Sequence, residues 1–443
     1  MTQTDPIDMA ARAVLQEEGD ACGEADACGE ADAYGEADAS WLADLDTPCY
    51  VFDPQRVIDR YGALREALGT QLIVSLKANS DRDLFVRCAH AFEDGIELAS
   101  QGELDIVVGR GTHVKYLNNP AMSEAFIRAG LVSRCRFVLD NPDVAQRFIA
   151  LAAGKPVQDV LLRLNVAALL GARAPKAWHD HFGMTCDEAA QVTARLAAVG
   201  IRVAGLHAFA GSGTFCVSDA DADGDRDADV IADAHVRATG SADLFGRADS
   251  ADLAYALADL ADTLTPLAGA PLTRLSVGGG FAQEGHDAAT LRRYRARLAP
   301  LAARYALAHE AGRAVFADAG AFVTRVTAVK RWGDRIIAVC DGGMSQNFLL
   351  AKTESMLKTW QAPVVVPHDG ARRQGSSEQA RLPITFVGST CNRADVIGYL
   401  PAGAQTPQTG DFAIFDRCGA YHHSYTVSGF LSHKPARVYL RHA

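Results

Sequence analysis

The sequence predicts an α/β fold with a second, mostly β domain at its C-terminal end, and three observations support this. Short apolar, β-branched runs alternate with segments in which apolar residues recur at helical spacing, such as 53–68 and 186–199. This alternation is the βα repetition of a parallel sheet or barrel. From about residue 322 onward short strands dominate and helical runs are few. The length of 443 residues suits two domains, because a barrel alone takes about 250 residues.

The expected strands share an apolar, β-branched composition, and several end at Gly-rich or polar turns. In the barrel region they are expected at 71–76, 160–162, 203–206, 272–277 and 313–316. A short strand at 47–53 precedes them, and strands at 322–329, 335–339 and 411–415 follow them. We therefore assign the barrel to residues 47–321 and the β domain to residues 322–443, which the strand near 48–53 is a candidate to join.

Two acidic segments are expected to lie outside the folded cores. Residues 1–46 hold 13 Asp and Glu against one base, and residues 20–39 repeat a six-residue unit of the type Asp-Ala-Cys-Gly-Glu-Ala. Such a segment buries too little apolar surface to offset its ordering entropy, so it is predicted to be disordered. An Asp-rich insertion at 217–250 imitates the start of a calcium loop, but Val230 stands where a bidentate Glu is needed. A solvated surface loop is the better interpretation of the insertion.

Charge and cysteine content argue against several classes of function. The net charge of −11 lies mostly in the tail, because the residues after 46 carry 41 acids and 42 bases. Neither nucleic acid nor a membrane is indicated as a partner, and no secretory signal is visible, so a cytoplasmic location is expected. The ten cysteines are scattered singly without a C-x-x-C pair, so no metal site is predicted and most thiols should be buried.

Three strand ends carry the residues of chemical interest. Residues 74–79 (Val-Ser-Leu-Lys-Ala-Asn) place Lys77 at the carboxyl end of an apolar strand, where barrel active sites are built, although a surface lysine is an equal alternative. The glycines of Ser-Val-Gly-Gly-Gly-Phe, which are Gly278, Gly279 and Gly280, let backbone amides approach an anion, so they predict a phosphate cradle, with a flexible turn as the alternative.

The third strand end is the segment 205–213 (Gly-Leu-His-Ala-Phe-Ala-Gly-Ser-Gly). Period-two alternation sends His207 and Phe209 to the same face, where one of them could cover a planar ring. Ser212 in the Gly-rich turn could add a phosphate contact. A buried histidine bonded to a backbone carbonyl is the alternative for His207. The three ends together predict a barrel mouth that holds an amine, a phosphate and a flat ring, which is the set that pyridoxal 5′-phosphate (PLP) requires.

From about residue 47 to its end, the chain resembles the fold-type III PLP decarboxylases, the family of diaminopimelate and ornithine decarboxylases. The resemblance implies a (β/α)8 TIM-type barrel with an alanine-racemase-like C-terminal β domain. It makes Lys77 the Schiff-base lysine, followed by the signature at 95–104 (Gly-Ile-Glu-Leu-Ala-Ser-Gln-Gly-Glu-Leu). It also implies a homodimer with shared active sites, in which Cys391 of the loop 388–395 enters the partner's site and Tyr421 of Gly-Ala-Tyr lies beside the cofactor.

Departures from the family pattern shape the expected substrate. The Glu-Pro-Gly-Arg motif of the family is matched to Asp318-Ala319-Gly320-Ala321, which keeps an acid for the pyridine nitrogen and lacks the arginine near the phosphate. Phe209 stands where the family stacks a histidine on the ring. Asn392 replaces the acid that holds a distal ammonium, so a simple diamine-type amino acid is a poor candidate substrate.

Thr-Cys-Asn at 390–392 and the segments 342–351 and 428–433 resemble the siderophore branch of this family. That branch decarboxylates citryl-amino-acid intermediates, citryl-diaminopropionate or citryl-serine, in pathways of the staphyloferrin B and achromobactin type. Under this hypothesis Asp318 keeps the ring nitrogen protonated and Cys391 returns a proton to Cα. Decarboxylation of diaminopimelate, ornithine, lysine or a D-amino acid remains the nearest alternative, followed by a racemase and a non-catalytic PLP-binding protein.

Overall fold

The computed structural model describes residues 39–111, 113–171, 180–217, 249–283, 285–351, 361–369 and 382–441. Every element discussed below lies in the unit formed by residues 45–443. The predictions for residues 1–38 and for positions 218–248 of the Asp-rich insertion lie outside the described residues.

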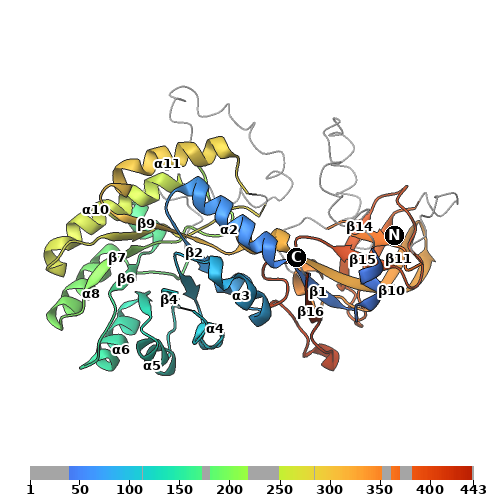
Figure 1. Ribbon diagram of the computed structural model, residues 1–443, viewed down its shortest axis with the longest axis horizontal. Helices are drawn as coiled ribbons and strands as arrows, with labels where there is room; N and C mark the ends of the chain where they lie inside the picture. The colour runs from blue at the N-terminus through green and yellow to red at the C-terminus, as the bar shows by residue number, and fades with distance from the viewer. Residues whose placement is uncertain are drawn as a thin grey trace, which may run out of the picture. The chain divides into compact units, whose positions relative to one another are not determined.

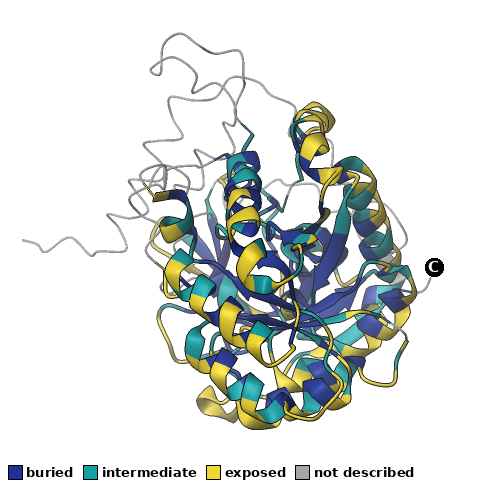
Figure 2. Cartoon of the chain, turned by 90° about the vertical axis from the view of Figure 1, so that its left-hand side faces the viewer, coloured by how far each residue is buried: buried dark blue, intermediate teal, exposed yellow. Residues whose placement is uncertain are grey.

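Eight parallel strands close into a barrel in the order β2-β3-β4-β5-β6-β7-β8-β9. They are β2 (Gln71–Ser75), β3 (Ile96–Leu98), β4 (Lys115–Asn118), β5 (Arg136–Leu139), β6 (Val160–Arg163), β7 (Val203–His207), β8 (Arg274–Ser276) and β9 (Ala306–Ala311). Helices follow the strands and surround the barrel (Figure 1). The longer ones are α2 (Pro54–Leu68), α3 (Arg82–Cys88), α4 (Gln101–Val107), α5 (Glu124–Val132), α6 (Pro142–Ala152), α8 (Cys186–Ala198), α10 (Ser250–Ala268) and α11 (Ala288–Ala302). Figure 2 shows the consequence for burial, with buried strands inside and helices exposed along their outer faces.

Capping residues explain where the helices begin. The side chain of Asp53 accepts from the amides of Gln55 and Arg56 at the start of α2. Thr185 and Glu188 form a reciprocal capping box at the start of α8. Each cap satisfies amides that have no partner inside the helix. Both helices match the predictions at 53–68 and 186–199.

The C-terminal β sheet has the order β12-β15-β10-β11-β13-β14. Its strands are β10 (Gly320–Trp332), β11 (Arg335–Cys340), β12 (Val364–Val366), β13 (Ile384–Val387), β14 (Val396–Leu400) and β15 (Phe412–Phe415). The strand nearest the chain start, β1 (Cys49–Phe52), pairs antiparallel with β10 and parallel with β16 (Arg437–Leu440). Tyr50 and Phe322 meet there in a fully buried aromatic pair at 5.1 Å. The barrel and the mostly β sheet confirm the predicted fold class.

One predicted strand is wrong, and its replacement matters for the site. Residues 313–316 form the short helix α12 (Arg313–Phe316), and the last barrel strand is β9, seven residues earlier. The β9 segment Ala-Leu-Ala-His-Glu-Ala lacks β-branched residues, so composition did not mark it as a strand. In α12 the apolar residues Val315 and Phe316 are buried by helical packing instead.

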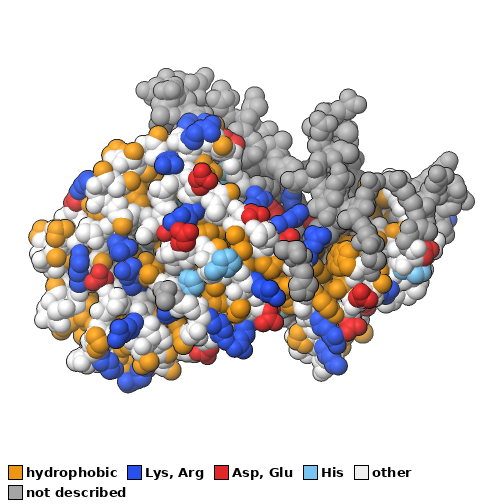
Figure 3. Space-filling view, in the orientation of Figure 1, with side chains coloured by type: hydrophobic (Ala, Val, Ile, Leu, Met, Phe, Trp, Pro, Cys, Tyr) orange, Lys and Arg blue, Asp and Glu red, His pale blue; other side chains and the backbone are white. Residues whose placement is uncertain are grey.

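None of the helices that the structure describes is long and apolar enough to span a membrane. On the face seen in Figure 3, basic and acidic side chains of the described residues are interspersed. The bases therefore do not gather into one single-sign patch on that face.

Candidate active site

Lys77 lies just beyond the carboxyl end of β2, in the short 3-10 turn η3 (Leu76–Ala78). Its Nζ donates to Oε1 and Oε2 of Glu97 at 3.3 and 3.2 Å, and Ser75 Oγ also donates to Glu97. Burial would lower the pKa of Lys77, but the carboxylates of Glu97 and Glu310 outweigh it and raise the pKa. Glu97, which belongs to the predicted signature 95–104 but was given no role, is therefore the nearest charged partner of this amine.

The three glycines after β8 are packed so tightly that no side chain would fit. A Cβ on Gly279 would lie 2.2 Å from the carbonyl oxygen of Glu310, and one on Gly278 would lie 2.7 Å from that of Ala208. Gly280 has a φ of +91°, and a Cβ there would lie 2.8 Å from the carbonyl oxygen of Gly211. Backbone with positive φ and no Cβ leaves amides open to an anion, so the loop suits a phosphate.

The loop after β7 brings two of its predicted residues to the mouth. Phe209 is half-buried, and its ring centroid lies 6.0 Å from Lys77 Nζ. Ser212 is exposed in the turn, and the loop is joined to the glycines by the bond from the Phe215 amide to the Gly280 carbonyl at 3.2 Å. The phenyl ring therefore lies near the lysine, and the hydroxyl nearest the glycines is that of Thr214, whose Oγ1 would lie 2.8 Å from a Cβ on Gly280. A phosphate contact from Ser212 stays a prediction.

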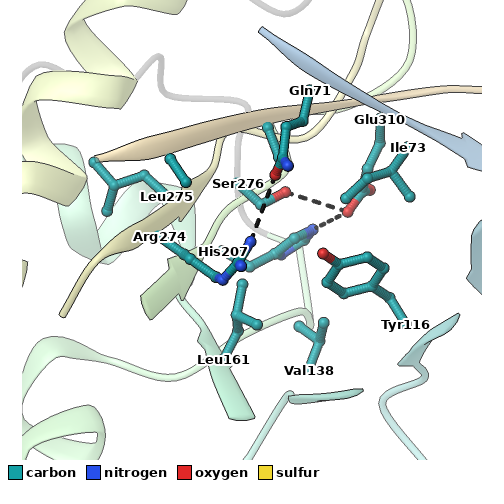
Figure 4. Close-up of a pocket in the computed structure, with 12 residues that line it drawn as sticks. Gln71, Ile73, Tyr116, Val138, Leu161, His207, Arg274, Leu275, Ser276 and Glu310 are labelled. Carbon is teal, nitrogen blue, oxygen red and sulfur yellow. Dashed lines mark hydrogen bonds and ion pairs between the residues drawn. The ribbon is translucent and has the colours of Figure 1, made fainter. Parts of the chain in front are cut away.

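His207 is placed differently from the prediction. It is fully buried, and its Nε2 donates to Glu310 Oε1 at 3.0 Å. Figure 4 shows the imidazole directed at Glu310 next to Ser276, inside the barrel. Of the two possibilities left open for His207, the structure has the buried histidine, with the carboxylate of Glu310 as its partner in place of a backbone carbonyl. Phe209 is the member of the pair that lies near Lys77.

The acid assigned to the pyridine nitrogen is also corrected. Asp318 forms ion pairs with Arg60 and, at 3.9 Å, with Arg417, and it is not among the charges that act on Lys77. Glu310 does act on Lys77 and lies at the end of β9. The run Glu310-Ala311-Gly312-Arg313 fits the family's Glu-Pro-Gly-Arg pattern at three of four positions, whereas Asp318-Ala319-Gly320-Ala321 fits it only at the glycine.

The arginine thought to be missing at Ala321 is consequently present as Arg313. Its guanidinium carbon lies 4.9 Å from the ring centroid of Tyr421. Gly312 lets this turn approach β2, because a Cβ there would lie 2.7 Å from the Cβ of Ala78. The motif could have been found in the sequence, had β9 been recognised as a strand.

Tyr421 is anchored directly to the lysine turn. Its amide donates to the carbonyl of Ala78 at 2.6 Å, and the side chain of Asn79 donates to the carbonyl of Gly419 at 2.8 Å. Tyr421 has a φ of +68°, a strained conformation that non-glycine residues rarely adopt. Burial raises the pKa of Tyr421 despite the positive charges of Lys77 and Arg313, so its hydroxyl stays protonated.

Cys391 lies on an exposed loop that a buried carboxylate holds in shape. Asp395 accepts from the Met344 amide at 2.7 Å and from the Thr390 amide and hydroxyl at 3.1 and 2.7 Å. Asn392 is exposed, and its Oδ1 accepts from the Ala394 amide at 2.9 Å. Among the eight cysteines that the structure describes, Cys391 alone is exposed and five are buried.

The residues that meet at the barrel mouth fit a PLP molecule. The amine of Lys77 suits the aldehyde of PLP, and the glycine loop, which has no room for a Cβ, suits its phosphate. A phenyl face suits the flat ring, and a buried acid suits the ring nitrogen. Cys391 and Asn392 are not joined to this group by any contact among the described residues.

Comparison with known proteins agrees with this geometry. Residues 49–419 match the family described as "Pyridoxal-dependent decarboxylase, C-terminal sheet domain". A diaminopimelate decarboxylase of Actinosynnema pretiosum subsp. auranticum is 28% identical over 86% of this chain and 81% of its own length. A diaminopimelate decarboxylase of Deinococcus radiodurans is 26% identical, with 88% and 89% covered.

Solved structures show the same fold at lower identity. The diaminopimelate decarboxylase of Helicobacter pylori complexed with L-lysine superposes with a TM-score of 0.71 at 18% identity, covering 91% of this chain and 93% of its own. The lysine/ornithine decarboxylase of Vibrio vulnificus complexed with putrescine gives 0.66 at 20% identity, with 91% and 96% covered. With the family match spanning most of the sequence, the chain belongs to the PLP-dependent decarboxylases of the ornithine, diaminopimelate and arginine decarboxylase family.

Proposed function

We propose that this carboxy-lyase decarboxylates a citryl-amino-acid intermediate, citryl-diaminopropionate or citryl-serine, in cytoplasmic biosynthesis of a carboxylate siderophore. The observation that carries the proposal is the loop around Cys391. Asn392 stands where a carboxylate would attract a distal ammonium, and its amide oxygen is engaged by the Ala394 amide. The next residue, Arg393, is exposed. A loop with one cation and no carboxylate at its tip suits an anionic substrate better than a diamine.

Each residue of the mouth has a role in this proposal. Lys77 would hold the cofactor through its amine, and Glu97, which accepts hydrogen bonds from Lys77 Nζ, would keep that side chain in place whenever the amine is free. The glycines 278–280, Ser212 and Arg313 would bind the phosphate, and Phe209 would cover the ring. When bound, PLP supplies the electron sink that makes loss of CO2 from Cα feasible.

Two further residues control protons. Glu310 would accept a hydrogen bond from the ring nitrogen of the bound cofactor and so favour its protonated form. Cys391, contributed by the second subunit of a homodimer, returns a proton to Cα, since a thiol of ordinary pKa is a competent acid near neutrality. Tyr421, held beside Lys77, contacts the cofactor from the β domain.

Decarboxylation of diaminopimelate is the second candidate, because two curated relatives carry that name. Its substrate ends in an ammonium and a carboxylate, so a site for it benefits from an acid at position 392. Replacing Asn392 with Glu would restore that acid. The two candidates therefore predict opposite effects of a single substitution.

The test is CO2 release from citryl-diaminopropionate, citryl-serine, diaminopimelate, ornithine and lysine by the full-length holoenzyme. We expect a citryl substrate to give a kcat/KM at least about 100-fold above that of diaminopimelate, a difference of about 2.7 kcal/mol. The Asn392→Glu variant should lose the citryl substrate and gain diaminopimelate. Efficient turnover of diaminopimelate by the unmodified enzyme would overturn the proposal, and Asn392→Ala is the matched control for loss of the amide alone.

A further inference from the structure

Three neighbouring barrel strands end in polar side chains that meet at one carboxylate oxygen. His207 ends β7, Ser276 ends β8, and Glu310 lies one residue before the end of β9. His207 and Ser276 are directly paired in the register of β7 and β8. His207 Nε2 lies 3.0 Å and Ser276 Oγ 3.4 Å from the same atom, Glu310 Oε1 (Figure 4).

The two donors leave the other carboxylate oxygen unoccupied. A carboxylate only accepts, so the proton of the His207–Glu310 bond must reside on Nε2. Among the described residues none donates a hydrogen bond to Glu310 Oε2. With Oε1 engaged twice from within the barrel, Oε2 is the oxygen left for a donor that enters through the mouth.

In this position His207 adds little to the stability of the fold. It is 0% exposed, and its Nδ1 is buried without a hydrogen-bond partner in the part of the chain that the structure describes. The walls next to it include Ile73, Val138 and Leu161, which line a cavity of about 10 Å³. An unpaired polar atom in such surroundings is unfavourable by about 1–3 kcal/mol, so an apolar side chain would serve stability better.

Glu310, in contrast, depends on His207. It is 8% exposed, and burial by itself would raise its pKa. The charge and hydrogen bond of His207, with contributions from Lys77 and Arg163, reverse this effect and lower the pKa of Glu310. A carboxylate that must stay charged in a barrel interior needs donors of this kind.

We propose that His207, assisted by Ser276, is a positioning residue that holds Glu310 with Oε2 toward the mouth as the acceptor for the cofactor's ring nitrogen. The inference concerns the cofactor alone, so it holds for any substrate of this scaffold. It assigns His207 a function through Glu310 and not by contact with PLP.

The test compares His207→Phe, which removes the donor, with His207→Gln, which keeps an N–H donor near the same place. For His207→Phe we expect kcat to fall by roughly 10–100-fold with KM within about twofold, because small misplacement of a fixed group has effects of this size. The pKa of the ring nitrogen, followed through the absorbance of bound PLP, should fall, since Glu310 without its His207 donor is less firmly charged and less firmly held as the acceptor. His207→Gln should recover much of both properties, and Ser276→Ala should shift them in the same direction by less.

A buried histidine outside the cluster provides the matched control. His309 precedes Glu310 on β9 and bonds to Thr70 and Tyr294 instead. His309→Gln should leave kcat and the absorbance titration unchanged even if it lowers the melting temperature. If His207→Phe is not recovered as folded holoenzyme, His207→Asn, whose amide ends short of Glu310, takes its place with the same expectations.

A double-mutant cycle completes the test. If His207 acts through Glu310, its removal should have little further effect on kcat once Glu310→Gln is present. Fully additive losses in the cycle, an unshifted absorbance titration in the donor-free variant, or a His207→Gln enzyme no better than His207→Phe would each overturn the proposal.

Discussion

The amide of Tyr421 donates to the carbonyl of Ala78 at 2.6 Å, so the β domain is hydrogen-bonded to the residue next to Lys77. The bond from Asn79 Nδ2 to the Gly419 carbonyl at 2.8 Å doubles this contact. Residues more than 300 positions apart are thereby fixed side by side. The position of Lys77 thus depends on both the barrel and the β sheet.

Lys77→Ala should abolish decarboxylation, with kcat lower by roughly three orders of magnitude or more, because no other described amine meets the glycine loop and Glu310. Reduction of the holoenzyme with borohydride followed by peptide mass spectrometry should label Lys77 in the native chain and leave the variant unlabelled. Lys330→Ala, at an exposed position on β10, is the control and should keep full activity. Label on another lysine of the native enzyme would contradict the assignment.

Glu310→Gln and Asp318→Asn distinguish the two acids proposed for the ring nitrogen. Glu310→Gln should lower kcat by about 100-fold or more, because the buried acceptor at the end of β9 loses its charge. Asp318→Asn should keep kcat within about twofold, because that side chain pairs with Arg60 and Arg417. Steady-state kinetics of both variants with one common substrate distinguish the two acids. A large loss of kcat in Asp318→Asn with little loss in Glu310→Gln would return the ring-nitrogen role to Asp318.

Gly279→Ala should weaken PLP binding, since the new Cβ would lie 2.2 Å from the Glu310 carbonyl and force the loop to move. We expect the dissociation constant of PLP, measured by fluorescence titration, to rise at least about tenfold and the free energy of unfolding to fall by about 1–3 kcal/mol. Gly62→Ala is the control, because a Cβ there meets nothing within 4 Å on helix α2. That variant should gain up to about 1 kcal/mol of stability and bind PLP normally.

Cys391→Ala should retain bound PLP but lose correct protonation of the product, lowering product formation by about 10–100-fold. If Cys391 serves the partner's site, mixing and reassembling inactive Lys77→Ala subunits with the weakly active Cys391→Ala subunits should raise activity to about a quarter of the native level, because half the dimers then hold one complete site. Normal turnover by Cys391→Ala would remove its role. Failure of the mixture to regain activity despite subunit exchange would place Cys391 in its own subunit's site.

His309 should make stability fall with acid. Burial lowers the pKa of His309 to about 3, whereas an unfolded histidine has a pKa near 6.5. The unfolded state therefore binds the extra proton between these values, and folding free energy decreases by up to about 1.4 kcal/mol per pH unit as the pH falls below 6.5. Melting temperatures of the native enzyme and His309→Gln between pH 7.5 and 5 should diverge in slope, with the variant less sensitive. Parallel curves would show that His309 does not contribute.

Much of the site could be predicted from local sequence. Lys77 after an apolar strand, three consecutive glycines after another, and a Gly-rich turn after a third are local signals, because strand ends and positive-φ glycines leave marks within a few residues. The fold class followed from the same βα alternation. The strand β1 could only be called a candidate for the β sheet, because its pairs with β10 and β16 join residues 268 to 388 positions apart.

The sequence by itself determined the barrel, the β domain and the strand ends that form the mouth. Only the tertiary structure decided which acid faces that mouth, since the Ala-rich β9 carries no compositional mark and the choice between Glu310 and Asp318 depends on where the last strand ends. It also decided that His207 is buried and bonds to Glu310. That bond spans 103 residues, and barrel closure alone, which places β7, β8 and β9 side by side, creates the proximity that no local pattern encodes.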